Sequence, residues 1–380
     1  MDVQLPGRRA DAERTGMTTE PLKQLAAEGV SLWLEGVGHR RLSSGELTGL
    51  VTSHGVSGVS CAPHGPSGLL DRSDYRARLD ELSSYGAGVA EAARALAARD
   101  VRTACDTLLP MWERSRGADG QVCAAIGHTR DVRGALAEAR SLHWTVDRPN
   151  LLVRLPADPV GLATASDCLA EGIGVAFGPV YSAESYELVL EAWLLGLERA
   201  VAAGLAPGRI PAAVQVPVSE IDTAARALLS AHTGRTAEAL RGRVAVAVAR
   251  LVFSAYERRL DSPRWRELVR AGARPHRLVW SFDGEAADRL SGGLVAEGTV
   301  QSLTAEGLRT LSATVVLMEG DTLSGRVHSA REDLRLLADL GVDWEQRAKE
   351  LGSESPHRQY GAWRELVDAV GAAMEQQTGR

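Results

Sequence analysis

A carboxylate, a guanidinium and an imidazole each lie in or just after a short apolar run: Glu35, Arg154 and His64. A carboxylate transfers protons, an imidazole titrates near neutral pH, and a guanidinium binds carboxylates, phosphates or a carbonyl oxygen. We therefore expect Glu35 and His64 to move protons and Arg154 to hold an anion or a carbonyl group. The alternatives are a structural buried ion pair between Glu35 and Arg154, and an exposed loop position for His64.

Other polar and aromatic side chains lie close to the ends of further apolar runs. A thiolate at Cys61 would be a nucleophile, but a small buried thiol is the more usual state of such a cysteine. Trp280 is more typical of a core residue than of a residue that stacks on a ligand. The expected substrate-binding residues are Gln215, Glu220, Tyr181, Asp283, Trp280, Cys61 and Phe177.

Lysine is nearly absent from the chain. Of 43 basic residues, all but Lys23 and Lys349 are arginine. Both lysines are near the ends of the sequence, so a mechanism that needs an amine has only two candidates.

These residues need a scaffold, and the chain alternates short apolar runs with helical periodicity of 3.6 residues. Eight runs separated by helices favour a parallel (β/α)8 barrel over an open sheet, although closure is not visible in a sequence. No glycine-rich phosphate loop follows an early strand. The expected strands are Val30–Leu34, Gly58–Cys61, Val122–Ile126, Leu151–Leu155, Gly174–Phe177, Ala212–Val216, Arg277–Trp280 and Leu294–Glu297.

The expected helices between these strands are long. A helical tail follows the eighth strand, with Leu351–Arg358 as a linker inside it because this segment contains glycine, serine and proline. We expect residues 1–20 to be a flexible leader and residues 21–380 to form one barrel domain with additional helices. The periodicity predicts the helices Tyr75–Ala98, Pro159–Ala170, Ser185–Ala203, Ile221–Leu229, Glu238–Arg258, Arg326–Leu340 and Tyr360–Met374.

The composition limits the class of function. The 380 residues carry a formal net charge of −6, which argues against a binder of nucleic acid or of membrane surfaces. The four cysteines have no C-x-x-C spacing, and no His, Asp and Glu cluster has metal-ligand spacing. We expect a cytoplasmic protein with a small-molecule substrate, no metal, no cofactor, no nucleic acid and no membrane partner.

Several stretches together resemble transaldolases of the actinobacterial type. The resemblance runs from about Leu22 to Val370, and the helical segments carry most of it. The stretches are Leu25–Gly36, Asp100–Trp112, Val146–Asp158, Ala237–Glu257, Trp265–Trp280 and Gly320–Trp344. The resemblance implies a transaldolase-like barrel and, by analogy, a possible homodimer through the C-terminal helices.

The same resemblance implies changes at the strand ends. The family forms a Schiff base through a lysine on the fourth strand, and Arg154 stands at that position in the run Asn150–Ala157. An arginine keeps its proton and is a poor nucleophile. Glu35 replaces an aspartate, Ala125 replaces a glutamate, and Gln215 and Glu220 replace a serine and an arginine.

From these changes we expect a barrel that does not use Schiff-base chemistry. The first hypothesis is a repurposed enzyme of specialised metabolism, which carries out carbonyl, aldol-like, isomerising or cyclising chemistry on a more apolar substrate. The second is a catalytically silent homologue that binds a ligand or a partner.

Overall fold

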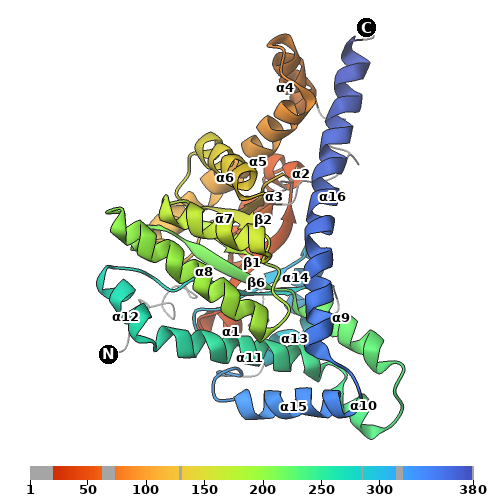
Figure 1. The fold of residues 1–380 in the computed structure, drawn as a ribbon. Coiled ribbons are helices and arrows are strands. Elements are labelled where there is room, and N and C mark those ends of the chain that lie inside the picture. The colour runs from red at the N-terminus through yellow and green to blue at the C-terminus, as the bar shows by residue number, and fades with distance from the viewer. Residues whose placement is uncertain (1–19, 62–72, 128–130, 285, 314–319, 379–380) are drawn as a thin grey trace.

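Eight parallel strands form a closed barrel in which each strand pairs with its neighbours in chain order and β1 pairs with β8 (Figure 1). This is a computed structural model, and it describes residues 20–61, 73–127, 131–284, 286–313 and 320–378. The predicted (β/α)8 barrel is confirmed. The strands are β1 (Ser31–Val37), β2 (Val56–Cys61), β3 (Gln121–Ala125), β4 (Leu151–Leu155), β5 (Val175–Phe177), β6 (Ala212–Val216), β7 (Arg277–Phe282) and β8 (Val300–Leu303).

Helices surround the barrel and pack against the outer faces of its strands (Figure 1). The helices of the first half are α1 (Glu20–Ala27), α2 (His39–Ser43), α3 (Glu46–His54), α4 (Ser73–Ser84), α5 (Val89–Arg114), α6 (Val132–Val146), α7 (Pro159–Ala170) and α8 (Ala183–Ala202). Those of the second half are η2 (Pro207–Arg209), α9 (Val218–Leu229), α10 (Arg235–Leu240), α11 (Arg243–Leu260), α12 (Pro263–Arg270), α13 (Ala286–Leu290), η3 (Ser291–Gly293), α14 (Ala305–Ala313), α15 (Val327–Asp339) and α16 (Trp344–Thr378). No described helix is both long and apolar enough to cross a membrane.

Side chains fill the inside of the barrel in layers, because alternate residues of each strand point inward. The middle layer contains a tryptophan, Trp33, whose indole lies against Gly58 of the next strand. A Cβ atom at Gly58 would lie 2.3 Å from the indole nitrogen, so only glycine leaves room for the ring. This layer is a floor beneath the carboxyl ends of the strands; it consists of Trp33, Cys123, Leu152, Ala176, Ala213, Val279 and Val300.

A buried arginine, Arg277, closes the amino end of the barrel. Its guanidinium donates hydrogen bonds to the hydroxyl of Ser31 at 2.7 Å and to the backbone carbonyl of Thr299 at 3.1 Å. The Ser31 hydroxyl in turn donates to Asp119 at 2.6 Å. This end of the barrel is therefore packed and tied together, and the active sites of such barrels form at the opposite, carboxyl end.

The predicted position of the eighth strand, Leu294–Glu297, is wrong. The apolar segment Leu294–Glu297 is buried but lies outside the sheet, and its Val295 backbone exchanges hydrogen bonds with Thr322. The strand is Val300–Leu303, which carries Gln301 and Ser302. Ser302 faces the barrel interior and Gln301 faces the segment outside the sheet, so polar side chains on both faces weaken the apolar pattern that we used to find strands.

Two expected helices are each divided at a glycine. The segment Tyr75–Ala98 spans α4 and the start of α5, and Gly86 between them has φ of 75°. The segment Glu238–Arg258 spans α10 and most of α11, and Gly242 between them has φ of 79°. A positive φ ends a right-handed helix, and glycine adopts it without steric cost.

The C-terminal helix α16 is continuous, so the expected linker at Leu351–Arg358 is wrong. Side chains at both ends of the helix are anchored: Trp344 and Leu351 belong to the main core, while Leu366 and Val370 pack against α4 and α5. This packing stabilises helix through Pro356, although proline disfavours a helix interior. Together α4, α5 and α16 form a helical extension on one side of the barrel (Figure 1).

Candidate active site

A layer of mostly polar side chains lies above the apolar floor, at the carboxyl end of the barrel. The same alternation that turns Trp33 inward also turns Glu35 inward, and it turns Arg154 inward above Leu152. Active sites of such barrels form at this end of the strands. The polar members of this upper layer are Glu35, Ser60, Arg154, Gln215, Ser281 and Ser302.

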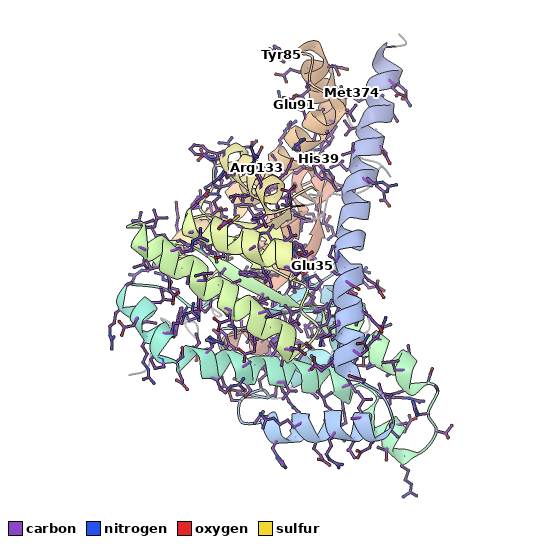
Figure 2. All side chains as sticks on the ribbon, in the orientation of Figure 1. Glu35, His39, Tyr85, Glu91, Arg133 and Met374 are labelled. Carbon is purple, nitrogen blue, oxygen red and sulfur yellow. The ribbon has the colours of Figure 1, made fainter. Side chains whose placement is uncertain are left out.

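Glu35 is held by side chains from two other strands. The hydroxyl of Ser302 on β8 donates a hydrogen bond of 2.6 Å to its Oε1, and the amide of Gln215 on β6 donates to the same oxygen at 3.3 Å. The Gln215 amide also donates to Ser281 on β7 at 2.6 Å. The carboxylate is therefore fixed in the barrel and half-buried, and Figure 2 marks it near the middle of the molecule.

Arg154 lies on β4 and makes a different contact. Its Nη2 donates a hydrogen bond of 2.8 Å to the hydroxyl of Ser60 on β2. Within the described part of the chain, no ion pair joins Arg154 to Glu35, so the alternative of a structural pair is wrong. Their separate partners leave both charged groups in the upper layer, each oriented by a serine.

A second group of carboxylates lies beside Glu35 on the β6–β7 side. The phenol of Tyr181 donates a hydrogen bond of 2.8 Å to Glu220, and the backbone of Asp283 is held by the Ser219 hydroxyl at 2.8 Å. Loss of hydration raises the pKa of Asp283, and the nearby charges of Glu220 and Glu35 raise it further. The rim of the site therefore combines acidic groups on one side with Arg154 on the other.

Three expected binding residues point away from the barrel interior. Trp280 and Phe177 are 0% and 1% exposed and belong to the core between the strands and the outer helices. Cys61 faces the same way, and burial raises the pKa of its thiol well above the usual range. Trp280 and Phe177 are therefore packing residues, and Cys61 is a buried thiol rather than a thiolate nucleophile.

Sequence reasoning missed three serines of the upper layer: Ser60 and Ser302 contact the charged groups, and Ser281 accepts a hydrogen bond from Gln215. Ser60, Ser281 and Ser302 all face inward, and the alternation along β7 from Arg277 indicates the position of Ser281. Ser302 was missed because its strand was misplaced. His64, expected to be a second proton carrier, lies outside the described residues.

Neither lysine is inside the barrel. The amine of Lys23 lies 3.8 Å from Glu20, and that of Lys349 lies 3.3 Å from Glu184 on α8; their side chains are 45% and 62% exposed. Among the residues that the structure describes, no group of three His, Cys, Asp or Glu side chains is placed to hold a metal. The four cysteines are buried and unpaired.

A closed barrel with a polar upper layer and a packed amino end is the architecture of a barrel enzyme. The family model described as transaldolase/fructose-6-phosphate aldolase matches residues 50–288. A transaldolase of Thermobifida fusca is 37% identical over 366 residues, which is 94% of this chain and 99% of the relative. A transaldolase of Acidothermus cellulolyticus is 36% identical over 94% of this chain and 98% of its own length, and transaldolase 1 of Streptomyces avermitilis is 34% identical over 94% and 96%. This chain belongs to the transaldolase family.

These relatives correct our expectation about function. We expected a repurposed enzyme for a more apolar substrate, or a silent homologue. Relatives that match almost the whole chain at 34–37% identity are transaldolases, so that expectation is wrong. The barrel interior agrees with the correction, because its upper layer is polar rather than cleared of polar groups.

Proposed function

We propose that this chain is a transaldolase that acts on small phosphorylated sugars at the carboxyl end of its barrel. The observation that carries the proposal is the near full-length similarity to transaldolases. The upper layer of the barrel supports it, because a carboxylate and a guanidinium there are held by neighbouring hydroxyl groups. Orientation by packed neighbours lowers the cost of bringing reacting groups together.

The chemistry follows from what aldol cleavage requires. A base removes the proton of a substrate hydroxyl, the adjacent carbon–carbon bond breaks to give an aldehyde, and the electron pair passes to the carbonyl oxygen of the remaining ketone. Glu35 is a base of the right type, and it is already oriented by Ser302. Reaction of the resulting enolate with a second aldehyde reverses these steps and completes the transfer.

A finer part of the proposal concerns Arg154. It stands at the position that the resemblance gives to the family's lysine, and its guanidinium is a donor for the oxygen on which charge develops. In the described structure Arg154 donates to Ser60, so a substrate oxygen would share or replace that contact. We propose that Arg154 binds the substrate carbonyl and that Glu35 moves the proton.

The test is a coupled assay of transfer from D-fructose 6-phosphate to an aldose phosphate, with the Thermobifida fusca transaldolase as positive control. We expect product with the native chain and a large loss with Glu35→Gln. Absence of product under conditions in which the relative is active overturns the proposed function.

A second test addresses Arg154 alone. Borohydride reduction in the presence of D-fructose 6-phosphate, followed by peptide mapping, marks any amine that has formed an imine. We expect Lys23 and Lys349 to remain unmodified because both are exposed at the surface and paired with glutamates. An adduct on either lysine would remove Arg154 from the role of carbonyl ligand.

A further inference from the structure

The loop that follows β5 is tied to the β6 side of the candidate active site. The backbone N–H of Val180 donates a hydrogen bond of 2.9 Å to the carbonyl of Gln215, whose side chain contacts Glu35. Gly178 approaches the same strand closely, because a Cβ atom at that position would lie 2.8 Å from the carbonyl oxygen of Gln215. The loop therefore continues the contact between β5 and β6 beyond the end of β5.

Tyr181, the next residue of this loop, is held by its ring and by its backbone. It is 2% exposed and belongs to the main core. Its backbone carbonyl accepts a hydrogen bond of 3.1 Å from the indole of Trp344 at the start of α16. These contacts leave the phenol oxygen little freedom to move, and it donates its hydrogen bond to Glu220 at 2.8 Å.

Glu220 reaches the rim of the barrel from the first turn of α9 and is half-buried. Its neighbour Ser219 holds the backbone of Asp283 at 2.8 Å. Loss of hydration raises the pKa of Asp283, and the charges of Glu220 and Glu35 raise it further. Because the interaction between charges falls with distance, both carboxylates lie near the same position of the rim. Glu220 is therefore part of the candidate active site.

A carboxylate at this position suits the hydroxyl groups of a sugar. Its two oxygens together accept about four hydrogen bonds, and each hydroxyl of a sugar is a donor. The same negative charge repels a phosphate. We therefore expect a sugar phosphate that has its carbonyl at Arg154 to place hydroxyl groups, and not its phosphate, against Glu220.

We propose that Glu220 is a specificity-determining residue that binds hydroxyl groups of the sugar substrate, and that Tyr181 is its positioning residue. The phenol fixes the carboxylate in one orientation, so less side-chain freedom is lost when the sugar binds. Trp344 supports Tyr181 from the side of the core and links this orientation to the start of α16. The inference rests on the proposed function for the identity of the ligand as a sugar phosphate.

Steady-state kinetics with D-fructose 6-phosphate test the two roles. Glu220→Gln keeps the size of the side chain but removes its charge, and Tyr181→Phe removes only the hydroxyl. Each should raise KM about tenfold with little change in kcat, since a contact made equally with the bound substrate and the transition state acts on KM. Tyr186→Phe is the matched control. It removes another buried phenol, whose hydrogen bond of 2.8 Å joins His276 before the amino end of β7, and it should leave KM unchanged.

The double variant separates positioning from direct contact. If Tyr181 acts through Glu220, adding Tyr181→Phe to Glu220→Gln should cause no further rise in KM. Additive effects would contradict the positioning role of the phenol. A fall in KM in Glu220→Gln would show that the carboxylate faces the phosphate, and it would overturn the role proposed for Glu220.

Binding separates this inference from the proposed function. Calorimetric titration with D-fructose 6-phosphate, without an acceptor, should show a Kd that rises about tenfold in Glu220→Gln and in Tyr181→Phe. A native chain that transfers sugars while neither variant changes KM or Kd overturns this inference and leaves the proposed function standing. A native chain that transfers none, but whose binding depends on both residues, gives the reverse result. Absence of binding overturns both. Because Glu220 is only half-buried, its variant decides even if Tyr181→Phe fails to fold.

Discussion

The hydroxyl of Ser302 on β8 donates a hydrogen bond of 2.6 Å to the carboxylate of Glu35 on β1. These are the two strands that close the barrel, so the contact exists only in the closed sheet. A hydrogen bond to a charged group contributes about 1.5–3 kcal/mol. The fold therefore orients the carboxylate through the same pairing that completes the barrel.

Glu35→Gln should lower kcat/KM for sugar transfer about 10²–10⁴-fold, the usual contribution of a general base. Ser302→Ala should lower it about tenfold, because the carboxylate remains but loses one of its two orienting contacts. Steady-state kinetics with D-fructose 6-phosphate measure both. Ser230→Ala, an exposed serine on the α9 side, is the control. Equal activity of Glu35→Gln and native protein would exclude Glu35 as the base.

Arg154→Ala should lower kcat/KM about 10²–10³-fold, since a donor at a developing negative charge contributes about that much. Arg154→Lys places an amine in the same layer, and an amine that loses its proton adds to a ketone. We expect borohydride with D-fructose 6-phosphate to leave an adduct at position 154 of Arg154→Lys. Mass spectrometry of the peptides measures it. An unmodified position 154 would place the substrate carbonyl elsewhere.

The sequence predicted the fold better than the details of the site. Strand β4 was predicted at its observed bounds because Leu151–Leu155 is apolar on both faces except at Arg154. The strand with Ser302 was missed for the opposite reason, since Gln301 and Ser302 interrupt its apolar pattern. Trp280 and Phe177 were assigned to the site because they are near strand ends, but strand parity turns them outward.

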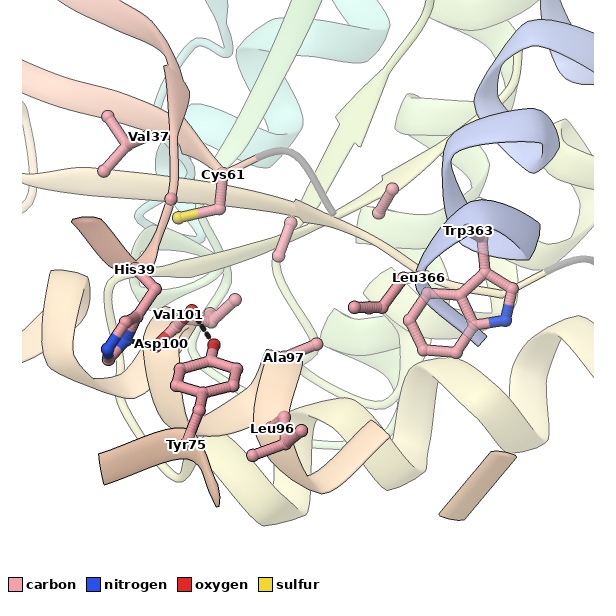
Figure 3. Close-up of a pocket in the computed structure, with 13 residues that line it drawn as sticks. Val37, His39, Cys61, Tyr75, Leu96, Ala97, Asp100, Val101, Trp363 and Leu366 are labelled. Carbon is pink, nitrogen blue, oxygen red and sulfur yellow. Dashed lines mark hydrogen bonds and ion pairs between the residues drawn. The ribbon is translucent and has the colours of Figure 1, made fainter. Parts of the chain in front are cut away.

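A small pocket between β1–β3 and the helical extension, lined in part by His39, Asp100 and Trp363, shows another limit of sequence reasoning (Figure 3). His39 and Asp100 are 61 residues apart and meet only because α2 and α5 pack together. No local spacing indicates such a pair. The wall formed by Trp363 also depends on α16 remaining helical through a segment whose composition is typical of a linker.

Acid should destabilise the protein through His276. The imidazole is buried with its Nε2 at 2.8 Å from the phenol of Tyr186, and burial lowers its pKa to about 3. In the unfolded chain a histidine titrates near its ordinary value of about 6.5. Its contribution to stability is therefore complete above about pH 6.5 and is lost as the pH falls toward about 3, by up to about 1.4 kcal/mol per pH unit.

Urea unfolding at pH 7, 6, 5 and 4 measures this dependence. His276→Gln removes the titrating group, so its free energy of unfolding should fall less steeply with acid than that of the native chain. Carboxylates titrate in both proteins and contribute equally to the change of unfolding free energy with pH. The difference between the two slopes therefore reports His276 alone. Parallel slopes would mean that the buried imidazole takes up its proton without unfolding.

Gly58→Ala should destabilise the barrel by about 1–3 kcal/mol, the usual cost of overpacking. The added methyl group would lie 2.3 Å from the indole nitrogen of Trp33, which is enclosed in the middle layer. Gly49→Ala on α3 is the matched control, because no heavy atom lies within 4 Å of its added Cβ. That control should be neutral or more stable, as alanine favours helix. Thermal unfolding of both variants measures the difference in stability. Equal melting temperatures would contradict the close packing of the Trp33 indole against Gly58.

Pro356→Ala should stabilise the protein, because Pro356 lies inside the continuous helix α16. In a helix interior, alanine favours the helical state by about 3 kcal/mol relative to proline. Removal of proline also gives the unfolded chain more conformational entropy, which offsets about 0.4–1 kcal/mol of this gain. The net gain in the free energy of unfolding should be about 2 kcal/mol by urea titration. Ser353→Ala, three residues earlier and exposed, should change it by less than about 1 kcal/mol. If Pro356→Ala gives no gain or a loss, the segment does not behave as helix in solution, and Trp363 would no longer be held over the pocket.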